Sequence, residues 1–179
     1  LLKDKKIDFL SVTGRTKSMD SFIEKISRKE YSNPRFQNTD FSAIRIIAYI
    51  ETDVAKMCNL IEQTFAVHRD LSYDKSQDLG VNKVGYRSVH FVCDLGQTRL
   101  ELPEYKPYEN LLFEIQVRTV LQHAWAEIEH DRNYKFSGVL PVQLQRRLYT
   151  LAAMLEIVDR EFVSLSVDID NYAQEVLTK

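Results

Sequence analysis

One stretch, residues 111–135, constrains the fold most, because it joins a predicted buried strand to a predicted amphipathic helix. In an extended chain successive side chains point to opposite faces, so this strand has one apolar face and one polar face. The apolar face carries Phe113, Ile115 and Val117, and the polar face carries Glu114, Gln116 and Arg118. A central strand of a covered sheet is normally apolar throughout. The polar row therefore either faces water at a sheet edge or lines a polar site.

A second predicted strand, residues 85–93, repeats this alternation. Tyr86, Ser88 and His90 fall on one face, and Val89 and Phe91 fall on the other. One polar-faced strand is compatible with a sheet edge, but two favour a polar cleft that both strands share.

A third predicted strand, residues 40–50, is rich in β-branched residues. Asp40 stands at its beginning, where a carboxylate can reach into a site while the rest of the strand stays in the core. Arg45 lies in the middle of this apolar run, and a buried guanidinium needs a partner. Arg45 is therefore expected to face either a carboxylate or the anion of a ligand.

A short basic helix is predicted from residue 19 to residue 29, with Ser18 as its N-cap. Five cations lie at and along it: Arg15, Lys17, Lys25, Arg28 and Lys29. Taken alone, they favour a solvated basic face over a clamp for polyphosphate. The clamp is the alternative, because guanidinium groups and helix N-termini both bind phosphate oxygens.

Strands that alternate with helices predict an α/β (α+β) fold. A helix is expected at residues 53–65, and a long polar loop at residues 66–84. We expect residues 1–140 to form one domain and residues 141–179 a long helical extension. From Leu144 to Val176 its apolar residues are spaced alternately four and three apart, as in a coiled-coil seam. That seam either packs on this chain or joins copies of it, and the spacing leaves both open.

Composition and motifs narrow the function. The net charge of −2 gives no global basic field for nucleic acid. No apolar run is long enough to cross a membrane. The two cysteines are expected to be reduced thiols, which predicts a cytoplasmic protein. His123, Glu127 and His130 share a helix face but lack HExxH spacing, so hydrogen-bonded or substrate-contacting roles are favoured over a metal site.

Four motifs occur in order along the chain: residues 14–18 with Ser21 and Lys25, residues 40–45, residues 85–90, and residues 114–119 followed by residues 123–130. Together they resemble the synthetase domain of the RelA/SpoT family of alarmone synthetases, in its small or stand-alone form. An ordered set of motifs is far more specific than any single one.

The resemblance implies a mixed β-sheet flanked by helices, distantly similar to nucleotidyltransferases. It implies transfer of pyrophosphate from ATP to the 3′-hydroxyl of GDP or GTP, which makes (p)ppGpp. Asp40 and Glu114 would be catalytic and hold Mg²⁺, with Glu114 also the candidate general base. Residues implied on the ATP side are Arg15, Lys17, Ser18, Lys25 and Arg45. Residues implied on the acceptor side are Tyr86, which would stack on the base, and Lys83, His90, Gln116 and Arg118. On this basis the basic helix becomes the ATP clamp.

One departure bears on the acceptor. Many family members carry a lysine four residues before the stacking tyrosine, whereas this chain has Asn82 there and Lys83 one residue later. The same chemistry on adenine nucleotides or on the 3′-end of tRNA is therefore an alternative. A local patch of Lys5, Lys6, Arg28, Lys29 and Arg132 would serve tRNA, although the net charge does not favour it. A catalytically silent nucleotide sensor is the third hypothesis.

Overall fold

A computed structural model describes residues 1–29, 31, 33–34, 38–74, 88–135 and 140–178. The strands are β1 (Ser11–Thr16), β2 (Ser42–Ala48), β3 (Ala66–Val67), β4 (Tyr73–Asp74), β5 (Val89–Asp94) and β6 (Phe113–Thr119). The helices are α1 (Met19–Lys29), α3 (Glu51–Thr64), α5 (Gln97–Leu100), α6 (Val120–Lys135) and α7 (Val142–Leu177), with a 3₁₀ turn, η1, at Lys106–Tyr108. None of the helices in this described part is long and apolar enough to cross a membrane.

The strands form one mixed sheet in the order β1-β2-β6-β5-β3, with β4 also paired to β5. Strands β2 and β6 are parallel, and the other pairs are antiparallel. Gln116 of β6 lies opposite Arg45 on one side and His90 on the other. Paired residues point to the same face, so the polar rows predicted on β5 and β6 meet on one face of the sheet.

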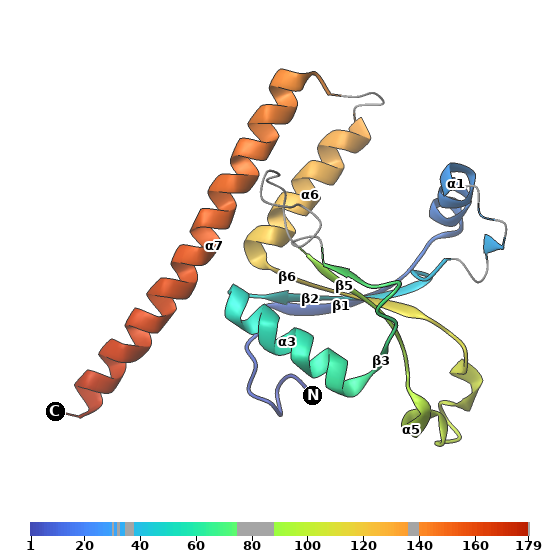
Figure 1. Cartoon of the computed structure of the whole chain (residues 1–179), viewed down its shortest axis with the longest axis horizontal. Helices are drawn as coiled ribbons and strands as arrows, with labels where there is room; N and C mark the ends of the chain where they lie inside the picture. The colour runs from blue at the N-terminus through green and yellow to red at the C-terminus, as the bar shows by residue number, and fades with distance from the viewer. Residues whose placement is uncertain (30, 32, 35–37, 75–87, 136–139, 179) are drawn as a thin grey trace.

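The opposite face carries the hydrophobic core. Helix α3 lies under the sheet on this side (Figure 1) and contributes Met57, Leu60 and Ile61. These residues pack against Ile115 and Val117 of β6, which are almost fully buried. One face of the sheet thus supplies the apolar burial that stabilises the fold, and the other is free to carry polar groups.

Helix α6 begins at a reciprocal capping box. The backbone N–H of Gln122 donates to Thr119 Oγ1 at 3.1 Å, and the backbone N–H of Thr119 donates to Gln122 Oε1 at 2.9 Å. The Thr119 hydroxyl also donates to Asp159 Oδ2 of α7 at 2.7 Å, and Asp159 is buried. Helix α7 is therefore attached to the chain at the junction of β6 and α6.

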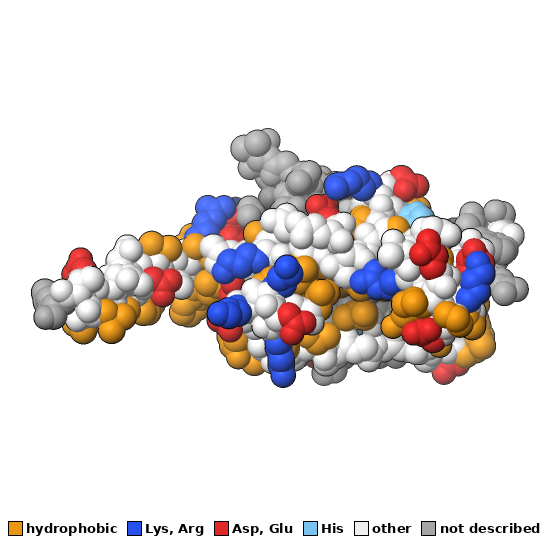
Figure 2. Space-filling view, turned by 90° about the horizontal axis from the view of Figure 1, so that it is seen from below, with side chains coloured by type: hydrophobic (Ala, Val, Ile, Leu, Met, Phe, Trp, Pro, Cys, Tyr) orange, Lys and Arg blue, Asp and Glu red, His pale blue; other side chains and the backbone are white. Residues whose placement is uncertain are grey.

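Beyond this attachment α7 continues past the rest of the molecule (Figure 1). Its projecting part has apolar side chains along one side (Figure 2). The exposed apolar residues of this part are Phe162, Leu165, Val167, Ile169, Tyr172, Val176 and Leu177. The helix predicted from residue 141 onward is thus present, with its second half largely uncovered.

The predicted fold class is confirmed: a mixed sheet flanked by helices, with a long C-terminal helix. One local prediction was wrong. The polar stretch from residue 66, expected to be a loop, begins with the short strands β3 and β4.

Candidate active site

Glu114 lies at the centre of the polar face, on the strand between β2 and β5. Its Oε1 atom accepts hydrogen bonds from the Gln116 amide and from His90 Nδ1, the latter at 3.1 Å. Burial acts to raise the pKa of Glu114, but these two hydrogen bonds outweigh it, so the pKa lies below its usual value. Glu114 is therefore a carboxylate at neutral pH, although only 7% of the residue is exposed.

Asp40 is held between two lysines just before β2. Lys17 Nζ donates to Asp40 Oδ2 at 2.8 Å, and Lys25 Nζ donates to Asp40 Oδ1 at 2.9 Å. Burial again acts to raise the pKa of Asp40, and the bonds from Lys17 and Lys25 outweigh it, so the pKa is lowered. The charge of Asp40 also acts on the pKa of Glu114, which places the two carboxylates in one electrostatic environment.

Three arginines share the same face. Arg15 is paired with Ala43, the partner of Glu114, and Arg45 is paired with Gln116. Arg118 Nη2 donates to Gln116 Oε1 at 2.7 Å, while its buried Nε has no hydrogen-bond partner among the described residues. Burial, reinforced by the charge of Arg45, lowers the pKa of Arg118 to about 10. This side of Glu114 therefore favours an anion.

Arg45 has a carboxylate partner that the sequence did not identify. Its Nη1 donates to Glu127 Oε1 at 2.9 Å, and its Nε lies 3.4 Å from Gln116 Oε1. Glu127 comes from α6 and also lies 3.5 Å from His123 Nδ1. Of the two partners predicted for Arg45, a carboxylate or a ligand anion, this structure has the carboxylate.

Tyr73 is a second site residue that sequence reasoning missed. Its ring stacks on the His90 imidazole, with centroids 4.5 Å apart and planes at 23°. Tyr73 lies in a stretch interpreted as loop, where no periodicity marks it as facing the site. Tyrosine and histidine are nevertheless placed side by side by the pairing of β4 with β5.

The structure thus brings most predicted residues into one region. Those on the polar face or at its edge are Arg15, Lys17, Lys25, Asp40, Arg45, His90, Glu114, Gln116 and Arg118. Ser18 instead caps α1, where its Oγ accepts the Ser21 backbone N–H at 3.3 Å. Lys83 and Tyr86 lie outside the described residues.

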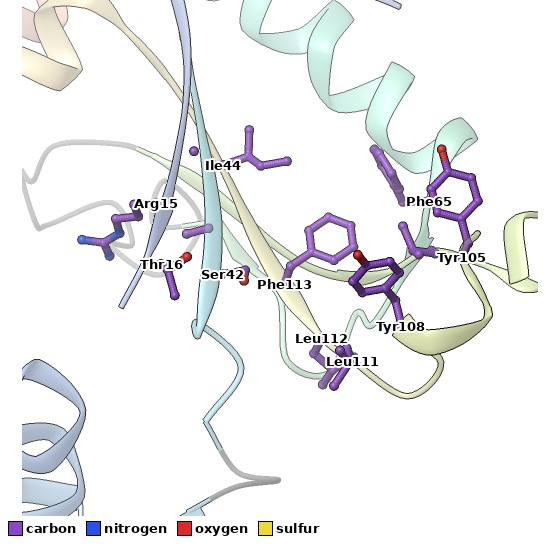
Figure 3. Close-up of a pocket in the computed structure, with 13 residues that line it drawn as sticks. Arg15, Thr16, Ser42, Ile44, Phe65, Tyr105, Tyr108, Leu111, Leu112 and Phe113 are labelled. Carbon is purple, nitrogen blue, oxygen red and sulfur yellow. The ribbon is translucent and has the colours of Figure 1, made fainter. Parts of the chain in front are cut away.

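A separate cavity of about 650 Å³ lies on the other side of the sheet. Phe65, Tyr105, Tyr108 and Phe113 surround it, while the guanidinium of Arg15 points away from them (Figure 3). Phe113 alternates with Glu114 along β6, so this aromatic cavity and the carboxylate lie on opposite faces. The polar face is therefore the candidate active site.

Two ionised carboxylates beside lysines and arginines on a mixed sheet define a site of the phosphotransferase type, because phosphoryl transfer depends on positioning and neutralising phosphate charge. The chain belongs to the RelA/SpoT family: the family described as "Region found in RelA / SpoT proteins" matches residues 14–139. The resemblance carried by the four sequence motifs is confirmed.

Individual relatives agree with this assignment. GTP pyrophosphokinase YwaC of Bacillus subtilis (strain 168) is 28% identical over 163 residues, covering 88% of this chain and 73% of that protein. The crystal structure of small alarmone synthetase 1 from Bacillus subtilis matches with a TM-score of 0.74 at 26% identity, covering 95% of this chain and 90% of that one. The small alarmone synthetase 1 structure bound to its product pppGpp matches with a TM-score of 0.73 at 27% identity, covering 94% and 85%.

Proposed function

We propose that this chain is a (p)ppGpp synthetase, which transfers pyrophosphate from ATP to the 3′-hydroxyl of GDP or GTP. The observation that carries the proposal is the pair of ionised carboxylates, Asp40 and Glu114, next to Lys17 and Lys25 on one face of the sheet. The family match and the relatives named as GTP pyrophosphokinases support the same reaction.

Asp40 and Glu114 are the proposed ligands of Mg²⁺. Magnesium is usually held by one or two carboxylates together with substrate phosphates, not by a cage of protein groups. The donor set fits this pattern, because Asp40 and Glu114 are both ionised and the charge of one acts on the other. When bound, Mg²⁺ would neutralise charge on the phosphates of ATP.

Lys17 and Lys25, the two lysines that bond to Asp40, are proposed to hold the ATP phosphates. Each bonds to Asp40 in this structure, so phosphate oxygens would replace or share the carboxylate as their partner. Arg15, Ser18 and Arg45 complete the proposed ATP side. Asp40 keeps Lys17 and Lys25 together in the free protein, and the ATP phosphates would compete with it for them.

Glu114 is the proposed base. The acceptor 3′-oxygen attacks the β-phosphorus of ATP, the bond from that phosphorus to the α,β-bridging oxygen breaks, AMP leaves, and the 3′-hydroxyl proton passes to Glu114. A lowered pKa makes Glu114 a weak base, which suits a loose transition state with little bond formation to the attacking oxygen. His90, Gln116 and Arg118, with Lys83 and Tyr86, are the proposed acceptor side.

An acceptor competition tests the function directly. The protein is incubated with labelled ATP, Mg²⁺ and a mixture of GDP, GTP, adenine nucleotides and tRNA, and the products are separated. A 3′-pyrophosphorylated guanine nucleotide is expected as the main product. Label on adenine nucleotides or tRNA would instead establish one of the alternative acceptors, and nucleotide binding without any product would establish a silent sensor.

Two members of the basic patch considered for tRNA lie apart from the helices that carry the other three (Figure 1). Lys5 and Lys6 belong to the N-terminal segment, which lies on the α3 side of the sheet, whereas α1 and α6 lie on the other side (Figure 1). The side chains of the other patch members, on α1 and α6, are outside the described part. The arrangement therefore adds nothing in favour of a tRNA acceptor.

Glu127→Gln is expected to lower the KM for ATP about threefold with little change in kcat. The substitution removes the charge that competes with ATP for Arg45, and partly exposed ion pairs of this kind contribute about 0.2–1 kcal/mol. Steady-state kinetics at varied ATP concentration measures the KM for ATP and kcat. Glu129→Gln is the control, because Glu129 is an exposed carboxylate on the same helix. A higher KM for ATP would instead mean that Glu127 orients Arg45 for binding.

We also propose that helix α7 joins copies of the chain through the apolar seam from Leu144 to Val176. A long run of exposed apolar residues on α7 favours association in water. Leu165→Asp is expected to lower the mass measured by light scattering to that of one chain without reducing helix content. Ser164→Asp adds the same charge to an exposed neighbouring position and is expected to leave the mass unchanged. A monomeric wild-type protein would contradict the proposal.

A further inference from the structure

Tyr73 contacts His90 in two ways at once. Its ring lies over the imidazole at 4.5 Å, and its hydroxyl oxygen lies 2.8 Å from His90 Nδ1. Burial raises the pKa of Tyr73 to about 12, and the charges of Glu114 and Asp40 act in the same direction. The hydroxyl therefore stays protonated at neutral pH and lies in the field of both carboxylates.

The same nitrogen of His90 faces Glu114. His90 Nδ1 lies 3.1 Å from Glu114 Oε1, and His90 Nε2 lies 2.8 Å from Ser88 Oγ. Because the ionised Glu114 only accepts hydrogen bonds, the bond between His90 and Glu114 requires a proton on Nδ1. The direction of the Nδ1–H bond then depends on how the ring is held.

Tyr73 is well placed to hold that ring. It lies on β4, which pairs with β5, and its register partner on β5 is His90 itself. Its ring packs flat on the imidazole. Because the single Nδ1–H donates toward Glu114, the Tyr73 hydroxyl oxygen, 2.8 Å from the same nitrogen, accepts a share of that hydrogen bond.

We propose that Tyr73 is a positioning residue for the reaction: by stacking on His90 and accepting a share of its Nδ1–H bond, Tyr73 holds the ring with Nδ1–H between its own hydroxyl and Glu114, and so fixes that carboxylate in its reacting orientation. The role rests on the proposed function, because it acts on the proposed base. It assigns to β4 a function that its length and exposure do not suggest.

Two substitutions separate the hydroxyl from the ring. Tyr73→Phe keeps the stacking and is expected to lower kcat about fivefold, whereas Tyr73→Leu removes both contacts and is expected to lower it about fiftyfold. The KM for ATP is expected to stay within about twofold, because the ATP side is not touched. Tyr105→Phe and Tyr105→Leu are the matched controls, since Tyr105 is 37% exposed against 39% for Tyr73 and lies on the other side of the sheet.

A double variant tests whether Tyr73 acts through His90. With His90 replaced by Gln, Tyr73→Phe is expected to change kcat less than about twofold, because the contact through which it acts is gone. The proposal is overturned if Tyr73→Phe lowers kcat by the same factor in the wild-type and the His90→Gln backgrounds. It is also overturned if the Tyr73→Phe single variant has the same kcat as Tyr105→Phe.

A spectroscopic measurement keeps this test independent of turnover. Nitrogen NMR of the His90 imidazole is expected to show a proton on Nδ1 in the wild type, and Tyr73→Leu is expected to shift or broaden that signal while Tyr105→Leu does not. An unchanged His90 signal in Tyr73→Leu overturns the proposal. If wild-type protein makes no pyrophosphorylated product, the proposed function fails while the NMR comparison still decides the contact.

Discussion

Glu114→Gln is expected to reduce pyrophosphate transfer at least about a thousandfold while leaving the fold intact. Both hydrogen bonds that Glu114 accepts end at Oε1, and the amide oxygen of glutamine can keep them. What is lost is the negative charge and the second acceptor oxygen, which serve the proposed metal and the proton of the acceptor. General-base and metal contributions of this kind are each worth orders of magnitude in rate.

The measurement is formation of labelled pyrophosphorylated guanine nucleotide from ATP, with GDP and GTP tested in turn. Glu101→Gln is the control, because Glu101 is an exposed carboxylate in the segment that connects β5 to β6. The melting temperature of Glu114→Gln should stay close to that of the wild type. A variant that retains more than about a tenth of the activity would contradict the role of Glu114.

Asp40→Asn is expected to reduce transfer to a similar extent, but with a different accompanying change. Without the carboxylate, Lys17 and Lys25 lose their shared partner and become more available to phosphate. ATP is therefore expected to bind at least as tightly as to the wild type when Mg²⁺ is omitted, although the reaction fails when it is present. Calorimetric titration with ATP, with and without Mg²⁺, measures both effects.

Asp53→Asn is the matched control, because Asp53 also pairs with a lysine, Lys56 at 2.7 Å, but on α3 and away from the site. It should retain activity. If Asp40→Asn retains activity as well, Asp40 is only the counter-charge of its two lysines.

The ion pairs of Asp40 also give stability a pH dependence of known sign. The pKa of Asp40 is below its ordinary value of 3.8 in the folded protein. The unfolded chain therefore binds the proton more readily at acid pH. The stabilisation is present above the ordinary value and is lost as the pH falls through the lower, folded one.

The sequence predicted the polar face because alternation on β5 and β6 is a local signal that needs no tertiary information. Strand β1 gives no clear signal in the sequence because it is an exposed edge strand: of its six residues only Val12 is a large apolar one. Strands β3 and β4 are two residues each, too short for any period to be seen. Their existence depends on pairing with β5.

Contacts between distant residues were the other limit. The sequence marked Lys17, Lys25 and Asp40 as site residues, but not that both lysines would bond to the one carboxylate. It left the partner of Arg45 open, and the structure places Glu127 there from a helix more than eighty residues away. Such pairings are set by how elements pack, which no spacing within one element encodes.

The position of β6 between β2 and β5 has a consequence for how this protein is made. Its parallel partner β2 ends at Ala48, and β6 begins only at Phe113, so the two can meet only after a long stretch of chain has been synthesised. Among the described strands, β6 is the one that joins the pair β1 and β2 to the group of β3, β4 and β5, so a nascent chain that stops short of β6 holds two separate groups. Contacts so distant in sequence form slowly. Catalytic competence should therefore appear late during translation and all at once, when β6 inserts.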